Sequence, residues 1–131
     1  MPLSEFRALY WVSTAYATIL LGFGINALIR PDNALSMFEL EPPAATADHN
    51  MVNSLMAVYG VRDIYMALAI YIAAFLGTRK SLGWTLVSTC AVGLADGVIC
   101  LMDGHDQWPH WSHGLMIGVV GSLLLGIFDR A

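Results

Sequence analysis

The sequence predicts an all-α integral membrane protein, a four-helix bundle that forms a single domain over residues 1–131. Hydrophobic residues make up 57% of the chain and charged residues only 12%, about half of the ~25% that soluble domains carry. So few charges would cover a water-facing surface poorly. Four apolar stretches are each close to the ~20 residues that cross a bilayer core, and they lie at about residues 8–30, 53–77, 82–102 and 109–128.

The first expected helix, at about residues 8–30, ends at Arg30 because Pro31 cannot continue the hydrogen bonding of a helix. Its apolar run is longer than the ~7–15 residues of a signal-peptide core, and no small-residue cleavage pattern follows it. We therefore interpret it as a retained helix. Residues 31–52 form an acidic external loop, in which "ALSMFEL" is a candidate amphipathic segment at the membrane surface.

The remaining helices are separated by short polar connections. A tight turn at residues 77–81 joins the second helix to the third, and "DGHDQWP" precedes the fourth, where Pro109 suits the first turn. These stretches are too long and too rich in Ala, Leu and Gly for the strands of a membrane barrel. In the fourth, Gly114, Gly118, Ser122 and Gly126 form a ridge of small residues that permits close helix contact.

The distribution of Lys and Arg predicts the orientation. With alternating helices, the face that holds both termini collects Arg7, Arg79, Lys80 and Arg130, whereas the opposite face has only Arg30. The positive-inside rule then places both termini in the cytoplasm. The sequence does not identify the membrane, for which the endoplasmic reticulum is one candidate.

One apolar run contains two opposite charges. In "YGVRDIYMALAIYIAAFLG", residues 59–77, Arg62 and Asp63 lie roughly 15 Å from the external end of the helix at 1.5 Å per residue. A charge near mid-bilayer costs at least ~2.5 kcal/mol, so both side chains should face the protein interior. Adjacent residues point ~100° apart on a helix, and we therefore expect no close pair between them. Asp96, near the same end of the third helix, is the expected partner of Arg62.

Polar residues from all four helices are expected at a similar depth in the external half, which predicts a cavity there. They are Asn26, Tyr59, Arg62, Asp63, Asp96 and His113. An arginine between two carboxylates can hold one as a general base, while burial favours the neutral, acidic form of the other. We interpret Asp63, Asp96 and Arg62 as candidate catalytic residues, and Tyr59, Asn26 and His113 as candidate substrate contacts.

Such a set can move a double bond, cyclise a polyene or open an epoxide without a cofactor. The leading hypothesis is therefore a cofactor-independent isomerase, cyclase or hydrolase acting on a lipophilic small molecule. The first alternative is a non-catalytic scaffold or accessory subunit, in which the charges set the helix register. The second alternative is a proton-coupled carrier working as a homo-oligomer, because four short helices leave little room for alternating access.

Other ligands are less consistent with the sequence. No basic cluster is present, which argues against a nucleic-acid partner. The segment "DGHDQWPHWSHG" offers imidazoles and carboxylates of the kind that bind zinc or iron, but it contains no established ligand pattern such as HExxH, and no metal site is assigned. Cys90 and Cys100 lie roughly 15 Å apart along one helix, beyond the reach of a disulfide.

Several short motifs together resemble a known family. They are "YGVRDIYMALAIYIAAFLG", "LGW", "ADGVIC", and "WPHWSHG" followed by "VVGSLLLG". In these motifs the chain is similar to small four-helix membrane proteins of unknown function from filamentous fungi and bacteria, over most of residues 10–128. Some of these proteins resemble those encoded among fungal secondary-metabolite genes, which implies polyketide-like or terpenoid-like substrates.

Overall fold

The fold was established from a computed structural model that describes residues 2–129. It is all-α over this range, and this part of the prediction is confirmed. Four long helices and two short ones follow one another: η1 (Leu3–Glu5), α1 (Arg7–Ile29), α2 (Pro31–Ser36), α3 (Thr46–Phe75), α4 (Arg79–Met102) and α5 (Trp108–Leu124).

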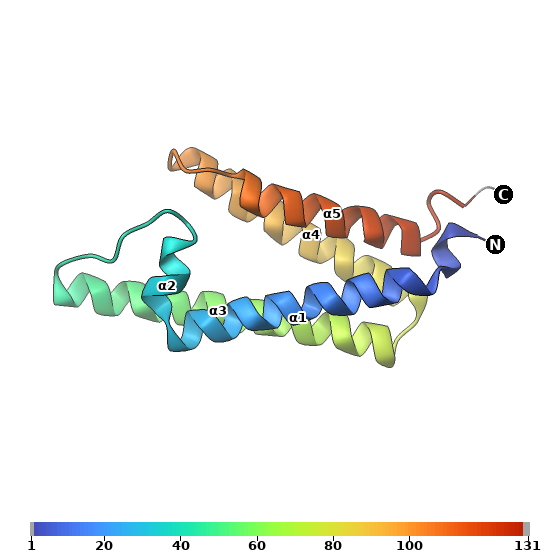
Figure 1. The fold of residues 1–131 in the computed structure, drawn as a ribbon, viewed down its shortest axis with the longest axis horizontal. Coiled ribbons are helices and arrows are strands. Elements are labelled where there is room, and N and C mark those ends of the chain that lie inside the picture. The colour runs from blue at the N-terminus through green and yellow to red at the C-terminus, as the bar shows by residue number, and fades with distance from the viewer. Residues whose placement is uncertain (1, 130–131) are drawn as a thin grey trace.

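The long helices are arranged as two antiparallel pairs. Helix α1 packs along α3, and α4 packs along α5 (Figure 1). The two pairs lie close together at the end that holds the chain termini and the α3–α4 turn, and they diverge toward the α4–α5 connection, where α2 lies between them. We call these the closed end and the open end. The polar residues identified in the sequence lie toward the open end.

The helix bounds differ most from the predicted ones within the expected loop 31–52 and at the end of α5, and α4 begins at Arg79, slightly earlier than expected. Helix α3 begins at Thr46, so part of the expected loop 31–52 is helical, and Asp48 in its first turn complements the helix dipole. Helix α2 begins at Pro31, whose fixed backbone suits a first helical position. Helix α5 ends at Leu124, earlier than expected, and Gly126 follows it in the left-handed region with φ of 79°.

Three helices in residues 2–129, α1, α3 and α4, are long and apolar enough to cross a membrane. Helix α5 has 17 residues and is shorter than these three. Large apolar side chains point outward along the long helices, as shown by Trp11 and Phe75, which are 71% and 72% exposed. Apolar exposure on this scale is typical of a surface in contact with lipid or with another apolar partner. Together these features indicate a membrane protein.

The closed end contains the main apolar core. Side chains from α3, α4 and α5 are completely buried there: Ile70, Leu82, Leu86, Ile117 and Leu124. Polar contacts tie the chain ends to the α3–α4 turn, because the buried Ser4 donates to the Asp129 carboxylate and accepts a 2.6 Å hydrogen bond from Arg79. The hydrogen bonds from Ser4 hold the pKa of Asp129 below its ordinary value. Apolar packing and polar contacts therefore both hold the closed end together.

Glycines set how closely the paired helices approach. A Cβ on Gly60 of α3 would lie 2.6 Å from the carbonyl oxygen of Gly24 on α1, and one on Gly121 of α5 would lie 2.8 Å from that of Gly83 on α4. No side chain fits at such distances. The predicted ridge on α5 holds in part, because its first two glycines contact α4 whereas Gly126 lies beyond the helix.

Gly60→Ala should lower the stability of the protein in detergent by about 1–3 kcal/mol, because the added methyl group overpacks the α1–α3 contact against a backbone atom. Gly22→Ala is the matched control. Gly22 is exposed on α1, and no atom lies within 4 Å of the position that an added methyl group would take, so the change should be neutral or slightly stabilising. Thermal unfolding measures both variants, and equal effects would contradict the described packing of α1 on α3.

Candidate functional site

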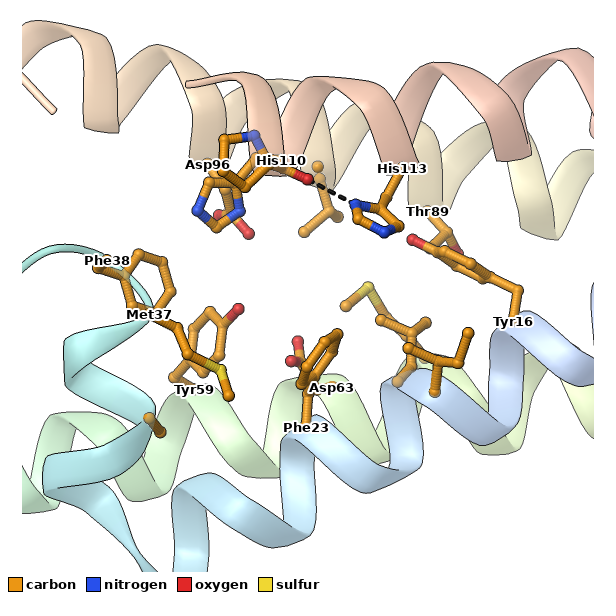
Figure 2. A pocket seen from close by; sticks show the side chains of 17 residues that line it. Tyr16, Phe23, Met37, Phe38, Tyr59, Asp63, Thr89, Asp96, His110 and His113 are labelled. Carbon is orange, nitrogen blue, oxygen red and sulfur yellow. Dashed lines mark hydrogen bonds between the residues drawn. The ribbon is translucent and has the colours of Figure 1, made fainter. Parts of the chain in front are cut away.

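A cavity of about 160 Å³ lies between the two helix pairs, toward the open end (Figure 2). All four long helices and the α2 segment contribute to its lining, which is mostly apolar and aromatic. It opens between α1 and α5, where the lining residues Ile19, Phe23 and His113 are exposed. The polar side chains on its wall are Tyr16, Tyr59, Asp63, Thr89, Asp96, His110 and His113.

Asp63 is the most deeply buried charged residue among those described. It is 2% exposed, and its carboxylate points from α3 into the cavity (Figure 2). Its ion contact is with Nη2 of Arg62, at 3.5 Å. This distance exceeds that of a normal charge-assisted hydrogen bond, for which ~2.7–2.9 Å is typical. Asp63 therefore presents a carboxyl group to the cavity with only loose compensation by a cation.

The second carboxylate, Asp96, is tightly paired. Its Oδ1 accepts from Nη1 of Arg62 at 3.0 Å, and its Oδ2 accepts from Nη2 at 2.8 Å. This two-pronged bond joins α3 to α4, and it confirms the expected contact between Arg62 and Asp96. The guanidinium also lies 4.4 Å from the centre of the Tyr59 ring, in a cation–π arrangement. Both acidic partners of Arg62 line the cavity, whereas Arg62 itself does not. Arg62 therefore holds these lining residues in place from outside the cavity.

The expectation of no close pair between Arg62 and Asp63 holds only in part, because the two side chains form an ion contact, although at 3.5 Å it is looser than the bond to Asp96. Their Cα–Cβ bonds do diverge, but the long arginine side chain folds back so that Nη2 lies between the two carboxylates, 2.8 Å from Asp96 and 3.5 Å from Asp63. One guanidinium therefore serves two acids. With all three groups ionised, the cluster carries a net charge of −1, and a proton on Asp63 would make it neutral.

His113 brings an imidazole to the cavity, from α5 on the side opposite Asp63 (Figure 2). Its Nδ1 lies 2.6 Å from the carbonyl oxygen of Pro109. A carbonyl only accepts, so Nδ1 carries the proton, and Nε2 of the neutral ring is left as an acceptor. The hydrogen bond within α5 therefore selects the tautomer of His113 that can take up a proton.

The structure brings five of the six candidate residues together, and Asn26 stands apart. The Asn26 amide donates to Oδ1 of Asn33 at 3.0 Å, which links α1 to α2 outside the cavity. Tyr59 lines the cavity, and its ring meets the ring of Phe38 edge to face at 5.1 Å. Asn26 therefore positions the α2 segment and lies away from the cavity surface.

Sequence reasoning missed the role of Phe38. This residue follows α2 and lies between the rings of Tyr59 and His110, at centroid distances of 5.1 Å and 5.0 Å. It therefore connects the two helix pairs across the open end. The "ALSMFEL" pattern marked the segment as amphipathic, but its inward direction depends on how α2 packs. Tyr16, which is not among the candidate residues selected from the sequence, is buried and also lines the cavity.

The histidine-rich connection forms surface contacts. In this connection, Nδ1 of His105 lies 3.6 Å from the Glu39 carboxylate. A separate surface pair lies at the start of α3, where Nε2 of His49 is 2.8 Å from the Asp32 carboxylate. Within residues 2–129, no group of three or more His, Cys, Asp or Glu side chains is placed to hold a metal ion. The wall of the cavity carries carboxyl, imidazole and phenol groups.

The fold and the site define an all-α protein with membrane-length helices around a cavity that holds a buried charge cluster. Residues 17–124 match the family described as domain of unknown function DUF4267, and the chain belongs to that family. The matched range contains every residue that lines the cavity except Tyr16. No curated protein and no solved structure matches the chain.

Arg62→Leu should destabilise the protein by about 3 kcal/mol, because it leaves two carboxylates that are 3% and 14% exposed without a cation. Adding Asp96→Asn to this variant should restore part of the loss. His49→Leu, which breaks the more exposed pair with Asp32, is the control and should cost less than about 1 kcal/mol. Thermal unfolding in detergent provides the comparison. If Arg62→Leu is no worse than His49→Leu, the shared arginine does not stabilise the cluster.

Proposed function

We propose that the protein is a cofactor-independent membrane enzyme that transfers protons to and from a lipophilic small molecule. All four long helices would span the bilayer as a bundle, with both termini cytoplasmic. Helix α5 has 17 residues and would extend about 26 Å. This length favours a thin bilayer such as that of the endoplasmic reticulum, whose core is ~27 Å. In this setting the opening between α1 and α5 would face the lipid and admit an apolar substrate.

The observation that carries the proposal is the placement of Asp63. A carboxyl group that is 2% exposed, loosely paired and directed into a cavity has no evident packing role there. A buried acidic group in a cavity is a common feature of acid–base sites. Across the cavity, His113 offers Nε2 as the complementary acceptor. We assign proton donation to Asp63 and proton acceptance to His113.

The cycle balances with these two groups alone. The Asp63 carboxyl gives its proton to one carbon of a double bond, which leaves a carbocation on the other carbon, or to an epoxide oxygen, whose C–O bond to the cationic carbon then breaks. In a cyclisation, a second double bond of the substrate forms a C–C bond to this cation and leaves a new cation. A proton then leaves a neighbouring carbon for Nε2 of His113, and a new double bond forms. Return of the proton from His113 to Asp63, through water or product, restores the starting state. The substrate is isomerised or cyclised, and no electrons are gained or lost.

The remaining residues would position the reacting groups and stabilise an intermediate. Both Asp96 oxygens are engaged by Arg62, so we assign these two residues to positioning and give the proton step to Asp63 alone. The aromatic rings of Tyr16, Tyr59 and Phe38 on the wall would stabilise a cationic intermediate by cation–π contact. This lining favours an isomerase or cyclase over an epoxide hydrolase. Polyketide-like or terpenoid-like molecules have double bonds and ring precursors suited to this chemistry.

A non-catalytic scaffold or accessory subunit is the second candidate. It is favoured by the two-pronged bond between Arg62 and Asp96, which fastens α3 to α4 and would be useful without any reaction. In that role, the side chain of Asp63 would matter for stability only. The two candidates therefore differ in the expected effect of Asp63→Asn, which keeps the size of the side chain and removes its acidic proton.

Asp63→Asn should preserve folding and reduce proton transfer by at least about 100-fold, as expected for loss of a general acid. Purified protein in D₂O is incubated with a panel of terpenoid polyenes and epoxides, and deuterium incorporation into carbon is followed by mass spectrometry. Asp103→Asn, which changes an exposed acid at the end of α4, is the matched control and should react like the unmodified protein. Equal incorporation in Asp63→Asn and in the unmodified protein would exclude Asp63 as the proton donor.

A further inference from the structure

A second hollow, a groove of about 380 Å³, lies between α3 and α4. It is flanked by Tyr65 and Trp84, which are 71% and 63% exposed. Met66, Thr89 and Val92 line both this groove and the cavity that contains Asp63. These three side chains are therefore the wall between the two spaces, and we call them the dividing wall.

The groove is more apolar than its composition suggests. The Thr85 hydroxyl donates to the carbonyl oxygen of Ser81 at 2.8 Å, and the Thr89 hydroxyl donates to that of Thr85 at 2.9 Å. Both hydroxyls are thus engaged by their own helix, as is common for threonine in helices. A ligand in the groove would therefore contact mainly the methyl groups of Thr85 and Thr89. Ser88 adds one further hydroxyl to the lining, and most of the surface comes from Tyr65, Met66, Ala69, Trp84 and Val92. The groove is therefore mostly apolar and suits a hydrocarbon chain.

The cavity at Asp63 is small. Its volume of about 160 Å³ is close to that of an apolar cavity of ~150 Å³ that takes up one benzene ring. Only the reactive end of a larger lipophilic substrate would fit beside Asp63. The rest of the molecule would extend outside this cavity. A change of rotamer at Met66 would open a passage through the dividing wall, and the unbranched side chain makes such a change at little cost.

The ion pair at the site also borders this passage. Arg62 is one helical turn before Met66 on α3, and Asp96 is one turn after Val92 on α4. Their two-pronged bond therefore holds α3 and α4 together next to the dividing wall. From Val92 to Thr85, α4 covers about 10 Å at 1.5 Å per residue, which is similar to the extended length of an eight-carbon chain.

We propose that the α3–α4 groove binds the apolar tail of the substrate. The substrate is then an elongated lipophilic molecule, with a ring-sized reactive end beside Asp63 and a hydrocarbon tail that passes Met66 and lies against Trp84. This inference rests on the proposed function, since it assigns the second half of the same ligand. It makes Met66 the residue that sets how long a substrate the protein accepts.

The probes are 4-methylphenol, which fills only the ring-sized cavity, and 4-(8-bromooctyl)phenol, whose terminal bromine quenches a nearby tryptophan. With the full chain in detergent, the long probe should quench part of the tryptophan fluorescence saturably, with about one molecule bound per chain. This component should be absent in Trp84→Phe. Unlabelled 4-methylphenol should abolish the quenching by competition, because both probes need the cavity at Asp63.

A pair of variants tests the passage. Because Met66 also lines the cavity, the ratio of the two affinities is compared. Met66→Phe should weaken the long probe about tenfold more than it weakens 4-methylphenol, as measured by calorimetry, because the ring cannot bend aside. Met66→Leu is the matched control and should leave the ratio of the two affinities unchanged. A long probe that binds without quenching Trp84 would place the tail in the α1–α5 opening and overturn the inference. So would quenching that 4-methylphenol does not displace, since the probe would then lie on the surface.

The same measurements separate the two proposals. If 4-methylphenol does not bind to the unmodified protein, the cavity is not a ligand site, and the proposed function fails together with the inference. If it binds and the long probe fails to reach Trp84, only the tail subsite is wrong. The proposed function is tested independently by deuterium incorporation.

Discussion

The arrangement of the site depends on one arginine that serves two buried carboxylates. In an apolar interior a charge is stable only beside an opposite charge or a set of hydrogen-bond donors. Arg62 meets this need for Asp96 with two hydrogen bonds, and Asp63 receives the remaining contact at 3.5 Å. The same guanidinium joins α3 to α4, supports Tyr59 and leaves one carboxyl directed toward the cavity. The packing of α3 on α4 and the proposed reactivity of Asp63 would therefore both depend on this cluster.

The two ends of the molecule divide these tasks. At the closed end, fully buried aliphatic side chains and a hydrogen-bonded cluster of Ser4, Arg79 and Asp129 hold the helix pairs together. At the open end the pairs diverge, and α2 with Phe38 bridges them by aromatic contacts. The cavity lies between the apolar core of the closed end and this aromatic bridge. Close packing at the closed end is thus combined with a cavity toward the open end.

The sequence predicted the features that depend on the pattern of apolar residues and on the depth of charged residues in the membrane. It indicated the long helices, and the contact of Arg62 with Asp96 followed from the cost of a charge in lipid. It could not predict the 3.5 Å contact with Asp63, which depends on a side-chain rotamer. Nor could it place Phe38 or Asn26, because both depend on the docking of α2. The early start of α3 was missed because its polar first turns resemble a solvated loop.

The proposed role of Asp63 is to exchange a proton with the contents of the cavity. Infrared difference spectroscopy of the carboxylic acid stretch, recorded while pH is varied in detergent, tests this role most directly. We expect a titrating band in the unmodified protein that responds to 4-methylphenol. The band should be lost in Asp63→Asn and kept in Asp103→Asn. A band that survives Asp63→Asn unchanged would contradict the assignment of Asp63 as the proton-transfer group.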